Sequence, residues 1–150
     1  MAITQALAVT WKRDIMNGLH AFGTSVVRAG TGADTFKIAL YTSSASLDAT
    51  TSAYTTSNEV VGTNYTAGGN TLTISQAPTF TSTTAWLDFA DSTWATSTIT
   101  ARGALIYNDT SSGNLAVGVL DFGSDKTSTA GNFSIIFPAG DSTSAIIRIS

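Results

Sequence analysis

Cysteine is absent from the 150-residue chain, and only 11% of its residues are charged, less than half the usual share of about 25%. The lack of cysteine excludes a disulfide framework, thiolate chemistry and a zinc ribbon. No stretch approaches the roughly 18 consecutive apolar residues of a membrane-spanning helix. The N-terminus also has no charged region ahead of an apolar run, so we expect neither a membrane span nor a signal peptide.

Positive charge is scarce as well. Seven Lys and Arg residues face ten Asp and Glu residues, and the net charge is −3. Lys12 and Arg13 are the only adjacent basic pair. Nucleic acid is bound through clustered Lys and Arg, so we expect no nucleic-acid partner.

Histidine, cysteine and glutamate, three residue types that often serve in catalysis, are nearly missing. His20 is the only histidine and Glu59 the only glutamate, so no second histidine can complete a metal cluster or a nucleophile–base set. We expect His20 at the C-terminal end of a helix, where the dipole favours it, rather than as a general base. The sequence predicts no enzymatic activity, no cofactor and no metal.

Two pairs of aspartates are close in sequence, Asp88 with Asp91 and Asp121 with Asp125. Such pairs can form a hydrolase dyad or a calcium site. Neither fits the spacing of an EF-hand loop, and aspartates in turns ordinarily accept hydrogen bonds from backbone amides. We expect that capping role here.

Hydroxyl side chains take the place of charges. The chain has 26 Thr and 18 Ser, 44 of its 150 residues. Threonine favours pleated, half-buried surfaces, and Ser/Thr clusters form turns. A surface this poor in charge is suited to lying against other subunits.

The segment Ala101–Phe122 is expected to form the central hairpin. Two apolar runs flank the turn Asn108–Asn114, where Asn, Asp and Gly113 tolerate a left-handed backbone. Because both runs are apolar on both faces, they are typical of central strands in a covered sheet. The residues 91–97 and 123–130 are predicted to be turn-rich or linker segments.

Further strands are predicted around this hairpin. Counting its own, the predicted strands are centred on Ile38, Leu72, Leu87, Leu105, Val117, Ile135 and Ile147. Their spacing of roughly 8–12 residues, without helical crossovers, indicates an all-β protein, a jelly-roll-like antiparallel β-sandwich. The polar residues 43–58 have no period, and we expect a surface segment that is either ordered by contact or not ordered at all.

One helix is predicted, over residues 4–20. Leu7, Trp11, Ile15 and Leu19 recur every four residues and would share one apolar face. This face would either pack over one end of the sheet or dock as an arm on a neighbouring subunit. The expected organisation is therefore a helix and Gly-rich connector over 1–34 and a sandwich over 35–150.

Three aromatic residues, Tyr54, Tyr65 and Trp94, are predicted to lie in loops. Rings in such positions either stack on carbohydrate or close the ends of a core. Both interpretations stay open at this stage.

Several long blocks resemble a family of small virion structural proteins of tailed bacteriophages. They are TFKIALYTSSASLDATTSAY, NEVVGTNYTAGGNTL, DFADSTWATSTITARGALIYN, LAVGVLDFGSDKTSTAGNFSIIFP and SAIIRI. The similarity extends from about Thr35 to the C-terminus and implies no catalytic residues.

Two functions are compatible with this resemblance. The first is a capsid cement or decoration protein, a homotrimer that binds the major capsid protein where capsomers meet on the outer head surface. It would be made in the host cytoplasm and carried in the virion. The alternative is a tail or head-fibre component, including an adhesin that binds host glycan through Tyr54, Tyr65 and Trp94. The copy number per particle would separate the two.

Overall fold

The structure is a computed structural model that describes residues 2–8, 10–11, 15, 18–23 and 33–150. Its strands are β1 (Ala6–Leu7), β2 (Phe36–Tyr41), β3 (Asn70–Leu72), β4 (Ile74–Thr81), β5 (Thr84–Phe89), β6 (Ser92–Asn108), β7 (Ala116–Ile135) and β8 (Ile147–Ile149). They form a five-stranded sheet in the order β1-β7-β6-β2-β3 and a three-stranded sheet in the order β4-β5-β8, with all strand pairs antiparallel. The predicted all-β antiparallel sandwich is confirmed.

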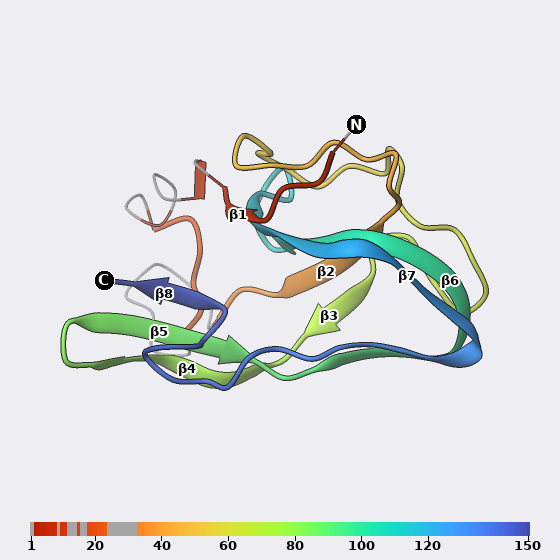
Figure 1. Cartoon of the computed structure of the whole chain (residues 1–150). Helices are drawn as coiled ribbons and strands as arrows, with labels where there is room; N and C mark the ends of the chain where they lie inside the picture. Colours follow the sequence, from red (N-terminus) through yellow and green to blue (C-terminus); the bar gives the residue numbers. More distant parts are fainter. Residues whose placement is uncertain (1, 9, 12–14, 16–17, 24–32) are drawn as a thin grey trace.

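The long hairpin of β6 and β7 joins the two layers. Its strands have 17 and 20 residues and pair from Tyr107↔Ala116 to Ser92↔Ile135. In Figure 1 both strands leave the upper layer, turn at the right-hand end and return in the lower layer toward β4 and β5. The predicted turn after Asn108 is confirmed, with positive φ at Gly113 and Asn114.

The prediction of separate strands around Val117 and Ile135 was wrong, because both residues belong to β7. The residues 91–97 and 123–130, predicted as turn or linker, lie almost entirely within β6 and β7. Cross-strand hydroxyl pairs occur here on both sides of the hairpin: Thr100 with Thr127 at 2.9 Å is exposed, and Ser97 with Ser128 at 2.8 Å is buried. These two segments were predicted as turn and linker because they are polar, but polar residues are also compatible with a strand that has one side in solvent.

The helix predicted over residues 4–20 is not seen. Ala6 and Leu7 form β1 and pair with Val119 and Gly118, and the backbone is helical among the described residues there only at Thr10, Trp11 and Ile15. Residues 9, 12–14 and 16–17 of the predicted helix lie outside the described residues. Pairing with the free edge of β7 overrode the four-residue periodicity, since tertiary hydrogen bonds and burial outweigh weak local preferences.

The core lies between the layers and is rich in aromatic rings. Phe36 of the five-stranded sheet stacks on Phe22, with ring centroids 4.2 Å apart. Its ring centroid also lies 6.0 Å from that of Phe89 in the three-stranded sheet. The opposite face of β2 and β6 is also buried, at Tyr41, Leu105 and Tyr107. The expectation that the central strands are covered on both faces is confirmed.

Candidate functional site: a tyrosine–glutamate cluster and an open groove

The segment 43–69 contains no strand and covers the face of the five-stranded sheet that points away from the three-stranded sheet. It is ordered by contact, one of the two alternatives expected for residues 43–58. Backbone hydrogen bonds run from Tyr54 to Asn114, from Ala116 to Ser52 and from Val60 to Leu40. Gly69 shows how close the approach is: it has a φ of +71°, and a Cβ there would lie 1.8 Å from the carbonyl oxygen of Ile38.

The structure brings the three predicted loop aromatics together, but turned inward. Tyr65 and Trp94 have ring centroids 5.9 Å apart, and Tyr54 stacks on Tyr107 at 4.6 Å. Trp94 belongs to β6 and is only 4% exposed. Trp94 thus closes the core, and the partly buried rings of Tyr54 and Tyr65 pack against its border.

Glu59 is the residue of this cluster that sequence reasoning missed. Its buried carboxylate accepts hydrogen bonds from the hydroxyl of Tyr54 at 2.6 Å, the hydroxyl of Tyr65 at 2.7 Å and the amide of Gly68 at 2.7 Å. A buried carboxylate is tolerated when donors satisfy it. The one available signal was that Glu59 is the only glutamate in a chain with nine aspartates.

All four tyrosines of the chain meet around this carboxylate and the neighbouring backbone. Tyr107 donates to the carbonyl of Gly68 at 2.9 Å, and Tyr41 donates to the carbonyl of Thr55. Burial raises the pKa of Tyr107 to about 12 and raises the pKa of Tyr41. Burial and the hydrogen bond to Glu59 raise the pKa of Tyr54 and of Tyr65. The phenols thus stay protonated near neutral pH and act as donors that hold the segment on the sheet.

The four residues predicted to share one helical face do not do so. Leu7 lies in β1, and Trp11 is 2% exposed with its ring 6.4 Å from that of Phe22. Ile15 packs against the core while partly exposed, and Leu19 is 42% exposed. Trp11 is therefore an anchor within this chain.

A second buried polar cluster connects the N-terminal segment to the end of β6. The side-chain amide of Asn108 donates to Asp34 at 2.7 Å and lies 3.2 Å from the Nδ1 atom of His20. Asp34 also accepts from the amide of Ala21 at 2.9 Å. His20 is thus buried beside Phe22 and Phe36, rather than at the C-terminal end of a helix as predicted.

Three of the four paired aspartates accept protein hydrogen bonds. Asp91 accepts from the amide of Phe137 at 2.9 Å, and Asp88 accepts from the hydroxyl of Ser75 at 3.0 Å. The amide of Gly123 and the guanidinium of Arg102 hold the pKa of Asp121 below its usual value. Among the described residues, no three His, Cys, Asp or Glu side chains are grouped as metal ligands would be. No helix in that part of the chain has the length and apolarity needed to cross a bilayer.

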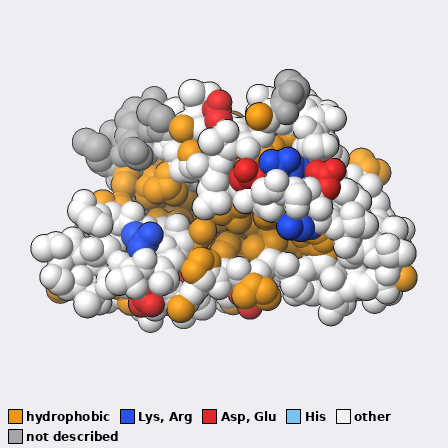
Figure 2. All heavy atoms as spheres, viewed as in Figure 1, with side chains coloured by type: hydrophobic (Ala, Val, Ile, Leu, Met, Phe, Trp, Pro, Cys, Tyr) orange, Lys and Arg blue, Asp and Glu red, His pale blue; other side chains and the backbone are white. Residues whose placement is uncertain are grey.

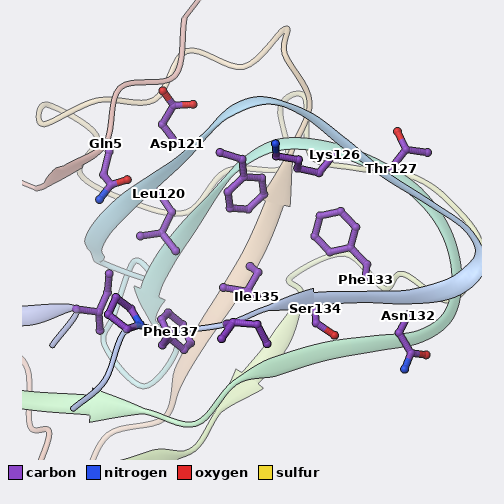
Figure 3. A pocket seen from close by; sticks show the side chains of 14 residues that line it. Gln5, Leu120, Asp121, Lys126, Thr127, Asn132, Phe133, Ser134, Ile135 and Phe137 are labelled. Atoms are coloured by element: carbon purple, nitrogen blue, oxygen red, sulfur yellow. The ribbon is translucent and has the colours of Figure 1, made fainter. Parts of the chain in front are cut away.

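An open groove of about 550 Å³ lies where the two halves of β7 face each other. Figure 2 shows apolar side chains in a hollow between the two layers. In Figure 3, Leu120 above and Phe133 and Ile135 below turn toward the same space, with Lys126 and Asn132 at its borders. Ile136 also lines the groove and is 69% exposed.

Fold and site together define an all-β sandwich protein whose core is open along one strand edge. No family model, curated protein or solved structure matches this chain.

Proposed function

We propose that this protein is a non-enzymatic structural component of a tailed-phage virion, a head cement that binds the major capsid protein as a homo-oligomer. The sequence resemblance supports the phage assignment. The observation that carries the proposal of a binding role is the groove along β7, where an apolar interior opens to solvent beside the exposed Ile136. Apolar surface of this kind is typical of protein–protein contacts.

The remaining surface supports the same function. Threonine and serine pairs, such as Thr93 with Ser134 at 2.8 Å, occupy exposed positions on β6 and β7. Such a surface offers many modest polar contacts and few charges. A cement needs no more than modest contacts at each site, because a copy that touches several capsomers gains from multivalent attachment.

The carbohydrate-binding alternative loses its main support. Tyr54 and Tyr65 donate their hydroxyls to Glu59, and Trp94 is buried. The hydroxyls of both tyrosines are therefore engaged within the fold, and the indole of Trp94 is not exposed for stacking. A position in the tail is the competing outcome of the experiment below.

The test is to mix the purified protein with expanded heads that lack it. We expect retention on the heads in hundreds of copies, weak binding to isolated capsid subunits, and better survival of decorated heads in heat and low salt. Absence of retention, or equal survival of bare and decorated heads, would contradict the cement proposal and favour the tail.

A further inference from the structure

The groove along β7 is open and lined mostly by apolar residues, and these properties suit the binding of an extended peptide segment. Both halves of β7 contribute to it, from Leu120 to Thr127 on one side and from Asn132 to Ile135 on the other. Its apolar lining includes Leu120, Phe122, Phe133, Ile135 and Ile136. With a volume of about 550 Å³ and an open mouth, the groove suits a segment laid along it.

The edge of β7 at this groove is free to accept a strand. One side of β7 pairs with β6. Along its other side, the described residues form backbone hydrogen bonds only near its start, where Ser52 contacts Ala116, Ala8 contacts Val117, and β1 pairs with Gly118 and Val119. Gln5, which directly precedes β1, lines the groove. Because β1 is antiparallel to β7, the free part of the edge begins at Leu120, beside the start of β1. The pairing of β1 itself shows that this edge binds an antiparallel strand.

The positive charge of Lys126 favours a segment with a negative charge in the groove. Its ammonium contacts the hydroxyl of Ser124 at 3.0 Å and forms no ion pair within the described residues. Asp121, the acid of the groove, is already held by Arg102 at 3.1 Å. A lysine at a strand edge discourages indiscriminate strand pairing. A segment that brings its own carboxylate overcomes this barrier.

We propose that the groove along β7 binds an extended segment of the capsid subunit, one with apolar side chains and an acidic residue that pairs with Lys126. This inference rests on the function proposed above and names its contact surface. An occupant that displaces water from a free strand edge must offer hydrogen-bond donors and acceptors to the backbone along its whole length. A peptide segment supplies them, whereas the apolar chain of an amphiphile does not.

The test compares variants of the full-length protein for retention on expanded heads. Lys126→Glu reverses the charge at the groove, and Ile136→Asp places a carboxylate at its exposed apolar border. The matched control is Val61→Asp, because Val61 is 95% exposed and does not line the groove. We expect each groove variant to bind roughly tenfold more weakly, a change that corresponds to about 1.4 kcal/mol. The control should bind like the unaltered protein, and Lys126→Glu should also reduce the salt dependence of binding.

The outcomes separate this inference from the proposed function. If the unaltered protein and both groove variants are retained equally, the groove is not the contact, while the cement function stands. If the unaltered protein is not retained, the cement function fails and the groove proposal fails with it. The proposal would also be overturned if native mass spectrometry showed an amphiphile bound to the unaltered protein and absent from Ile136→Asp. The same holds if Ile136→Asp converts an oligomer of this protein into single chains that still bind heads, because the groove would then be the contact between copies of the protein.

Discussion

At the scale of single residues, Glu59 holds the cluster that orders the segment 43–69. In Glu59→Ala, the hydroxyls of Tyr54 and Tyr65 and the amide of Gly68 would lose their acceptor. A buried donor without a partner costs about 1–3 kcal/mol. The amide of Gly68 is buried, whereas the two hydroxyls are only partly buried. We therefore expect the free energy of unfolding, measured in urea, to fall by about 1–3 kcal/mol.

Two control variants accompany this measurement. Glu59→Gln keeps one acceptor oxygen and should cost less than Glu59→Ala. Tyr54→Phe removes a single donor to the carboxylate and should also cost less. Equal stability of Glu59→Ala and the unaltered protein would show that the cluster is not needed to hold the segment.

At the scale of elements, the N-terminal segment is fastened by Trp11 rather than by a helical face. Trp11→Ala should lower the free energy of unfolding by roughly 3–5 kcal/mol, because it empties a packed site in the core. Leu19→Ala is the matched control: Leu19 is 42% exposed and should change stability by no more than about 0.5 kcal/mol. Chemical denaturation of both variants measures the difference, and equal effects would contradict this assignment.

At the scale of the whole molecule, β6 and β7 belong to both layers, so the layers should unfold together. Tyrosine in an unfolded chain has a pKa of about 10, whereas that of Tyr107 is about 12 in the folded protein. Below pH 10, phenols are protonated in both states and stability is unaffected. Above it the unfolded chain loses protons that the fold retains, so stability falls as the pH rises, by up to about 1.4 kcal/mol per pH unit for each tyrosine.

We therefore expect one alkaline transition, followed together by tyrosinate absorbance and by far-ultraviolet circular dichroism. Tyrosinate absorbance that rises well before the dichroism changes would contradict the buried cluster. Two separate changes in dichroism would instead show that the sheet β4-β5-β8 unfolds independently.

The local pattern was sufficient wherever apolar alternation and turn residues agreed. It predicted the all-β class, the strands around Ile38 and Leu105, and the turn after Asn108. Its two kinds of error share one cause, which is pairing between distant residues. The strand β1 exists because the edge of β7 is open to it, and the polar end of β7 exists because β6 lies beside it.

The site shows the same division. The sequence by itself determined that this protein has few groups for acid–base chemistry and a surface of hydroxyls, since composition alone decides both. Only the tertiary structure decided that Tyr54, Tyr65 and Trp94 face inward, because the carboxylate of Glu59 and the ring of Tyr107 reach them through folding and not through proximity in sequence. The groove, likewise, exists only because β7 bends back on itself, which no local pattern of residues specifies.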